Sequence, residues 1–239
     1  MQPHLGRNAA AVVRSVGNST TLTTLGYSIS SLGTLTAANV ATTNLHTYMK
    51  RTDYLVTTAA TNAIASVRSG ANQFTIGGPA ARLGGFHMIT RWGPATGVAT
   101  LTHRAFCGMR VNLVPTDVEP SSLTNIVGMG WDASDANIQF MHNDAAGTAN
   151  KIDLGAAFPV PTVDRTAVYE IALFSPPGTT QSLSYEITDL TSGAVATGTV
   201  TSDIPSASAL LSHMLQFSAG GTSSVIGLAL MSIYIETDL

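Results

Sequence analysis

The sequence predicts an all-β protein, an antiparallel sandwich of two sheets preceded by an extended N-terminal arm. Two observations carry this prediction. About a dozen short segments rich in β-branched and aromatic residues are separated by turn signals of Gly, Pro, Asn and Asp. No segment shows the apolar period of 3.6 residues that marks an amphipathic helix. Short strands at such regular spacing are typical of β-sandwiches.

The stretch 167–200 shows the strand pattern most clearly. A β-prone run from Val168 to Phe174 ends at two prolines, and then Leu183, Tyr185 and Ile187 alternate with polar residues. A third β-prone segment follows a tight turn, so the stretch predicts a meander of three adjacent antiparallel strands. A meander buries one face only, and the rest of the chain is therefore expected to supply a second sheet.

Other strands are predicted from similar patterns. Residues 52–58 and 63–69 are predicted to pair as a hairpin across a short polar turn. Between residues 103 and 111, Ala105, Cys107 and Met109 alternate with a second set of side chains that faces the other way. Cys107 thus lies in mid-strand, where a lone cysteine is usually a small buried hydrophobe.

The first fifty residues differ from the rest, which divides the chain into a segment 1–50 and a β-sandwich domain 51–239. Residues 1–50 are rich in Thr, Ser, Ala and Gly, and their apolar residues have irregular spacing. This composition predicts an extended arm, with one or two helical turns between residues 36 and 48. Two interpretations stay open: a flexible tail, or an arm that anchors the protein to a partner and becomes ordered there.

Composition narrows the range of partners. Charged residues make up 10% of the chain, against about a quarter in an average soluble domain. Such a surface suits a protein whose flanks are covered by identical neighbours or by a larger assembly. The net charge is −3 and the 11 basic residues are scattered, so no nucleic-acid partner is expected. No apolar run has the length of a membrane span, so no membrane insertion is expected either.

Several phrases, taken in order, resemble a known family. They are GGFHMITRWG (84–93), HRAFCGMR (103–110), NIVGMGWDASDANIQFMHND (125–144), KIDLGAAFPVP (151–161), VYEIALFSPPG (168–178) and the ending IYIETDL. The series resembles the C-terminal domain of tailed-bacteriophage fibre and related virion proteins, whose fold is similar to the concanavalin-type jelly roll. The resemblance covers residues 51–239.

The resemblance implies a setting and a set of partners. The protein is expected in the virion, as a fibre, spike or other surface-exposed component, and as a homotrimer. Residues 1–50 are expected to dock onto other virion proteins, while the jelly roll is displayed outward. The resemblance leaves open whether the position is tail, baseplate or capsid. The alternative function is a lectin-like module that binds host surface polysaccharide, and the two functions are compatible.

The sequence gives only a weak indication of catalytic residues. Glu170 and Glu186 are expected opposite or diagonal to each other on neighbouring strands, and two close carboxylates can hydrolyse glycosides. Glycosidases of the concanavalin type carry a third acid on the same strand, which this sequence lacks. The glutamates are therefore interpreted as residues of a solvated face, and the protein is expected not to be an enzyme, a glycan depolymerase being the least favoured alternative.

Candidate binding residues lie where two strands are predicted to end. Trp92 and Trp131 each precede a loop, and Asp132 and Asp135 follow Trp131. Exposed tryptophans stack on sugar faces, so the glycan-binding hypothesis assigns these four residues to the site, although packing is the more usual role of two tryptophans in a large β domain. The acidic loop could hold calcium, but its spacing favours an ordinary turn. No metal site and no cofactor are expected.

Overall fold

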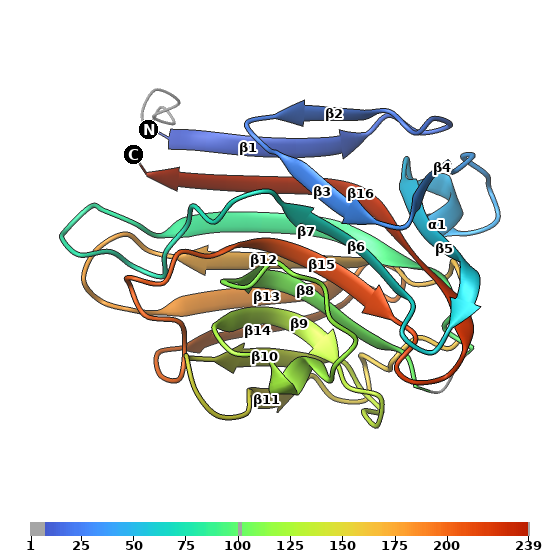
Figure 1. Cartoon of the computed structure of the whole chain (residues 1–239). Helices are drawn as coiled ribbons and strands as arrows, with labels where there is room; N and C mark the ends of the chain where they lie inside the picture. The colour runs from blue at the N-terminus through green and yellow to red at the C-terminus, as the bar shows by residue number, and fades with distance from the viewer. Residues whose placement is uncertain (1–7, 100–101, 239) are drawn as a thin grey trace.

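The computed structural model describes residues 8–99 and 102–238 as two antiparallel sheets packed face to face (Figure 1). Helix accounts for 3% of it, and the predicted all-β sandwich is confirmed. Sheet A has the order β14 (Ala194–Val200), β13 (Leu183–Asp189), β12 (Tyr169–Ser175), β7 (Phe86–Thr96), β16 (Ser224–Asp238), β1 (Asn8–Ser15), β2 (Leu22–Leu25), with β5 (Thr52–Ala60) beside β16 and β4 (Thr34–Ala37) beside β5. Sheet B has the order β11 (Asn150–Asp153), β10 (Gln139–Asn143), β9 (Ile126–Trp131), β8 (Arg104–Arg110), β15 (Ser212–Ser218), β6 (Ile64–Ser69), β3 (Ile29–Leu32). Two short helices complete the fold, α1 (Leu45–Tyr48) and the 3-10 helix η1 (Pro120–Ser122).

The predicted meander is confirmed as β12, β13 and β14, which are neighbours at one side of sheet A. The alternation also holds, because Leu183, Tyr185 and Ile187 face the core while Ser184 and Glu186 face outward. Period-two patterning of this kind places every second side chain on one face of a sheet. The meander thus supplies three of the nine strands of sheet A.

Strand β8 is buried on both of its faces. Cys107 and Met109 belong to the main core between the sheets, and Phe106 packs on the other face of sheet B against Met214. The segment between β8 and β9 covers this outer face, with Leu123 in the same cluster. Burial raises the pKa of the Cys107 thiol well above its usual value, as expected for a buried hydrophobe.

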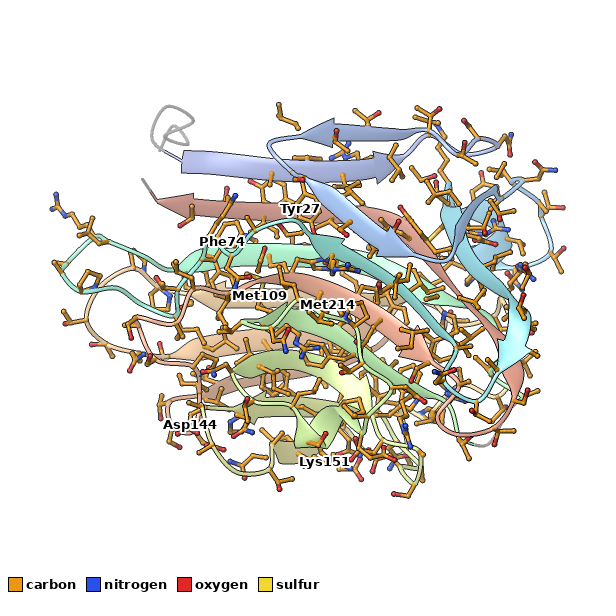
Figure 2. All side chains as sticks on the ribbon, viewed as in Figure 1. Tyr27, Phe74, Met109, Asp144, Lys151 and Met214 are labelled. Carbon is orange, nitrogen blue, oxygen red and sulfur yellow. The ribbon has the colours of Figure 1, made fainter. Side chains whose placement is uncertain are left out.

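The structure differs from the expectation for residues 1–50. The first seven of these residues lie outside the described part, and residues 8–37 supply strands β1 to β4 to the two sheets. Strand β1 pairs with β16 from Asn8 to Arg14, and Val13 is completely buried. The hydroxyl of Tyr27, labelled in Figure 2, hydrogen-bonds Nδ1 of the buried His213 of β15 at 3.0 Å. The described part of this segment therefore lies against the sandwich instead of extending away from it.

The reason lies in the length of β16. Its first half pairs with β5 and its second half, from Ser232 onward, pairs with β1. Without β1, half of a long strand would be an open edge with unpaired backbone groups. The strands of the N-terminal segment are mostly four residues long, too short for a period to be seen in the sequence. The predicted helical turn is present as α1.

The hairpin predicted across residues 52–69 is wrong. Strand β5 belongs to sheet A and β6 to sheet B, so the turn at residues 61–63 crosses from one sheet to the other. Two consecutive amphipathic strands have the same sequence pattern whether they pair with each other or face each other across the core. Only their partners, β16 for one and β15 for the other, distinguish the two arrangements.

Candidate ligand-binding site

Trp92 and Trp131 lie inside the sandwich. Both side chains have 0% exposure, and their rings stack at a centroid distance of 6.0 Å and an angle of 13°. Trp92 comes from β7 of sheet A and Trp131 from β9 of sheet B, so the pair joins the two sheets. The predicted sugar-stacking role is corrected for both, since neither ring has a face open to a ligand. Strand β7 also continues to Thr96, past the position where the sequence predicts its end.

The indole of Trp131 connects this stack to the loops. Its Nε1 donates a hydrogen bond to Nδ1 of His103 at 2.9 Å, and His103 itself is 5% exposed. Burial lowers the pKa of His103, and hydrogen bonds from its imidazole to the backbone carbonyls of Pro161 and Val98 oppose that effect without cancelling it. His103 is therefore a neutral acceptor that holds together segments before β8, after β9 and before β12.

The two predicted aspartates lie together just beyond Trp131. Oδ2 of Asp135 accepts a hydrogen bond from the backbone N–H of Asp132 at 2.8 Å, which closes a turn. Oδ1 of Asp132 accepts from the backbone N–H of Ser121 at 3.0 Å. The remaining oxygens, Asp132 Oδ2 and Asp135 Oδ1, both face the ammonium group of Lys151 on β11, labelled in Figure 2. The loop is a turn fastened by an ion pair, as its Asp and Asn content favours.

Lys151 occupies the position between the carboxylates that a cation ligand set would need. Its Nζ lies 3.0 Å from Asp132 Oδ2. Burial lowers the pKa of Lys151, but hydrogen bonds to Asp135 and Asp132 outweigh burial and raise it overall, so the lysine is charged at neutral pH. Asn143 and Asp144 do not join the cluster, because they bond to Leu123 and Ala146. Within residues 8–99 and 102–238, no group of three His, Cys, Asp or Glu side chains could hold a metal ion.

Two hollows open at this end of the sandwich, on either side of the segment 159–162. The first has a volume of about 180 Å³ and the second about 320 Å³. The first is lined by Val98, His103, Asp132, Ala133, Asp135, Ala136, Val160 and Thr162. The second is lined by Pro159, Val160, Pro161, Thr162, Thr166, Ala167, Tyr169, Asp189 and Thr191. Thr162 is exposed and belongs to both. We call these two hollows the loop-end site. They combine hydroxyl and carboxylate groups with apolar walls, as small-ligand sites do.

The glutamate pair is part of a solvated face. Glu170 faces Arg91 directly across β12 and β7 and forms an ion pair with it. Glu186 faces Ala172, so it lies diagonal to Glu170, and it is exposed. One carboxylate is thus held by a guanidinium group and the other is in solvent. The pair lacks the two facing acids that glycoside hydrolysis needs.

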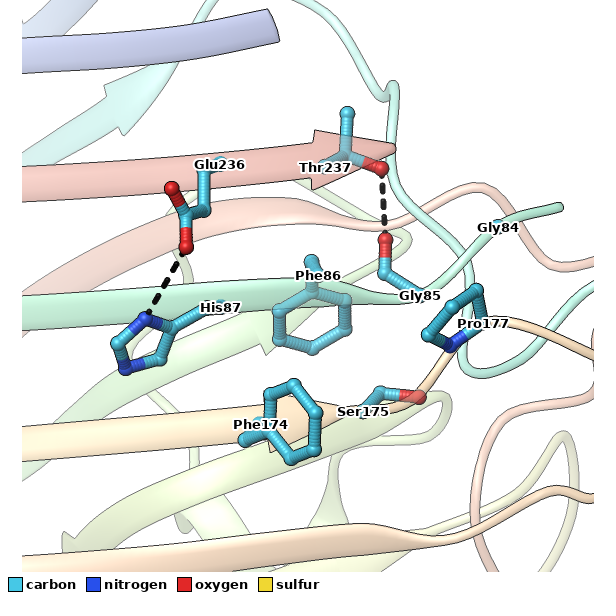
Figure 3. Close-up of a pocket in the computed structure, with 9 residues that line it drawn as sticks. All are labelled: Gly84, Gly85, Phe86, His87, Phe174, Ser175, Pro177, Glu236 and Thr237. Atoms are coloured by element: carbon cyan, nitrogen blue, oxygen red, sulfur yellow. Dashed lines mark hydrogen bonds and ion pairs between the residues drawn. The ribbon is translucent and has the colours of Figure 1, made fainter. Parts of the chain in front are cut away.

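A smaller pocket of about 120 Å³ lies at the opposite end of sheet A, where β7 begins and β12 and β16 end (Figure 3). Among its lining residues, Nδ1 of His87 lies 3.6 Å from Oε1 of Glu236. Thr237 donates a hydrogen bond to the carbonyl of Gly85 at 2.7 Å, and Phe174 adds a half-exposed ring. Its polar groups bond mainly to one another, which makes it a weaker candidate than the loop-end site.

No protein-family model matches the sequence, and no curated protein matches it. Solved structures do match over nearly the whole chain. The lectin UEA-II complexed with galactose has 13% identity and a TM-score of 0.58 over 98% of this chain and 100% of that one. A protein of unknown function from Shewanella oneidensis MR-1 has 13% identity and a TM-score of 0.60 over 98% and 87%.

The CBM2 module of the evolved Dit protein of Lactobacillus casei BL23 phage J-1 has 13% identity and a TM-score of 0.50 over 96% and 97%. At such low identity these likenesses show the fold alone. The fold is the lectin-type jelly roll that the sequence predicts. They do not test the finer resemblance to phage fibre domains.

Sequence reasoning missed Lys151 and Thr162. The lysine lies 16 residues after Asp135, and only the pairing of β10 with β11 brings it beside the turn. The one signal in the sequence is that the chain has two lysines and that one of them follows an acidic loop. Thr162 gives no signal, since an exposed threonine in a proline-rich segment is unremarkable by itself.

We expect Lys151→Ala to destabilise the fold by about 2 kcal/mol, because two partly buried carboxylates then face each other without a cation. Added calcium should then raise the melting temperature of this variant while leaving the wild type unchanged, because carboxylate oxygens become free. Thermal unfolding with calcium and with a chelator measures both effects. Lys50→Ala removes an exposed lysine and serves as the control, with a change below about 0.5 kcal/mol. A Lys151→Ala variant as stable as the wild type would contradict the assignment.

Proposed function

We propose that the protein is a glycan-binding module that contacts its saccharide at the loop-end site. The observation that carries the proposal is the lectin-type sandwich over the whole described chain, together with open hollows at the end where several loops meet. Loops fixed on a rigid scaffold are the usual place for binding residues. One of the similar structures, UEA-II, is described as a complex with galactose, which supports a saccharide ligand.

The site offers groups with which sugar hydroxyls can form hydrogen bonds. Asp132 and Asp135 present carboxylate oxygens in the first hollow, although Lys151 shares them. Thr166, Thr191 and Asp189 line the second hollow. The tryptophans act here only through packing, because their stack fixes the strand that leads into Asp132. Of the four residues predicted for the site, the two aspartates remain as ligand contacts.

The site contains no arrangement for covalent chemistry. The described chain offers no facing pair of carboxylates at the loop-end site beyond Asp132 and Asp135, and Lys151 holds both. His103 accepts a hydrogen bond from Trp131 and is only 5% exposed, so it is not placed to act as a base on a ligand. Binding without turnover is the function that these groups support.

The expected result for Thr162→Trp is loss of glycan binding, because the bulk of an indole at this shared wall obstructs the hollows. Thr180→Trp places the same bulk in the loop between β12 and β13, at the opposite end of sheet A, and binding should persist. An array of bacterial surface polysaccharides measures binding of all three proteins. Equal binding by Thr162→Trp and the wild type would contradict the loop-end site, and no binding by the wild type would contradict the function.

We also propose that this module is carried on the surface of a bacteriophage particle as a homotrimer. The resemblance of residues 51–239 to phage fibre domains supports the setting, and so does the low charge content. The description of one similar structure as part of a phage protein is further support. The N-terminal segment contributes exposed apolar side chains, among them Leu25 at 65% and Leu35 at 38% exposure, that suit a contact with another virion protein.

Cryo-electron microscopy of the phage particles tests this second proposal. We expect three copies of the chain around one axis, with strands β2 to β4 turned toward a neighbouring virion protein. The physical reason is that these strands expose the side chains of Leu25, Leu32 and Leu35, whose burial is favourable. Particles that lack the chain, or that carry it as isolated single copies, would contradict the proposal.

A further inference from the structure

A groove of about 620 Å³ lies on the outer face of sheet A, away from the loop-end site. It is lined by Arg14, Ser15, Val40, Tyr48, Met49, Lys50, Arg91, Met231 and Ser232. No residue of this lining belongs to the loop-end site. Arg91 and Trp92 are consecutive in β7, so the side chain of Arg91 points outward while the indole of Trp92 points into the core. The groove and the core stack thus lie on opposite faces of one sheet.

Strand register puts two arginines in one row across the floor of the groove. Arg14 of β1 faces Ser232 of β16, and Ser232 faces Arg91 of β7. Neighbouring strands lie about 4.8 Å apart, so the Cα atoms of the arginines are about 10 Å apart with a hydroxyl group between them. Flexible arginine side chains at that separation can reach one anionic group from two sides.

The groove has positive charges that its own lining does not neutralise. Among the residues that the structure describes, neither Arg14 nor Lys50 forms a hydrogen bond or ion pair through its side chain, and both are exposed. Arg91 pairs with Glu170 from outside the groove, and its side chain is still 47% exposed. No Asp or Glu belongs to the lining. Three cations gather here on a chain with a net charge of −3, so the groove favours an anion.

The wall that carries Lys50 and Tyr48 is fixed in place. His46 of α1 bonds through Nδ1 to the carbonyl of Ala167 at 2.9 Å, and Arg51 donates to the carbonyl of Thr47 at 2.9 Å. Gly17 leaves room for the stem of Lys50, since a Cβ at this position would lie 2.9 Å from the Cγ of the lysine. A wall held by such bonds loses little freedom when a ligand binds.

The side chain of Tyr48 indicates which class of ligand the groove fits. Its ring is 64% exposed at the rim of the groove, beside the apolar side chains of Met49 and Val40. An exposed aromatic ring next to hydroxyl and cationic groups fits a sugar ring that carries an acidic substituent. Nucleic acid would need a longer basic surface than three side chains. The volume falls in the range of small-ligand sites, about 300–1,000 Å³.

We propose that this groove binds an anionic saccharide, with the carboxylate or sulfate group above Ser232 between Arg14 and Arg91. Lys50 contacts the same group from the side, and the sugar ring lies against Tyr48. The site is independent of the loop-end site and does not require that the latter bind a glycan. The common chemistry is an acidic group on a sugar, whether carboxylate or sulfate.

The test compares three immobilised polymers: polygalacturonate, which carries carboxylates, dextran sulfate, which carries sulfates, and neutral dextran. The wild type is expected to bind at least one of the two anionic polymers and not dextran, with an affinity that falls as salt is raised. The double variant Arg14→Gln/Lys50→Gln should bind about tenfold more weakly, because it loses two charge-assisted contacts. Arg82→Gln removes one exposed charge from a loop outside the groove, and it should bind as the wild type does.

Thr162→Trp separates the two sites, since this variant should keep full binding to the anionic polymer. Binding by the double variant equal to that of the wild type would overturn the proposal, as would equal loss in Arg82→Gln, which would indicate a nonspecific charge effect. Absence of binding to both anionic polymers would also overturn it, and would leave an acidic protein surface as the partner of the groove. Tyr48→Ala should weaken binding at high salt, where the ring contributes most.

Discussion

The stack of Trp92 on Trp131 is the contact on which the candidate site depends. One ring belongs to each sheet, so the pair fixes the distance and the angle between the sheets where the loops leave them. The buried indole N–H of Trp131 needs an acceptor, and His103 supplies it. The same histidine is packed against the segments that form the walls of the first hollow. Core packing and site geometry are therefore parts of one arrangement.

The positions of the residues next to Trp131 and Trp92 follow from this arrangement. Trp131 is the last residue of β9, and Asp132 begins the turn that Lys151 fastens from β11. In the facing sheet A, the residue before Trp92 is Arg91, which lines the outer groove. One position in β7 thus separates a core residue from a groove residue. The alternation of a strand places two surfaces with different chemistry back to back.

Strand patterns in the sequence predict the sandwich well where strands are long and half buried. The meander β12 to β14 is the example, because each of its strands alternates over seven residues. The prediction is wrong for residues 52–69, where two adjacent strands enter different sheets. It also places residues 1–50 outside the fold, because pairing with β16 depends on residues more than 200 positions away.

The candidate site is predicted only in part, for the same reason. Asp132 and Asp135 are predicted from the sequence of their own loop, but strand pairing brings their partner Lys151 to them. Trp92 precedes Gly93 and Pro94 and Trp131 precedes Asp132, all of them turn residues, as exposed loop aromatics do. They are buried because their rings face each other across the core. This contact joins residues 39 positions apart, and no local pattern encodes it.

Both tryptophans are core residues that position the site without contacting a ligand. Iodide quenching of tryptophan fluorescence tests it most directly, because the chain contains only these two tryptophans and the whole signal comes from them. The structure predicts that iodide quenches the folded protein far less than the urea-unfolded protein. Equal quenching of the folded and unfolded protein would contradict the claim, since it would place at least one indole in solvent.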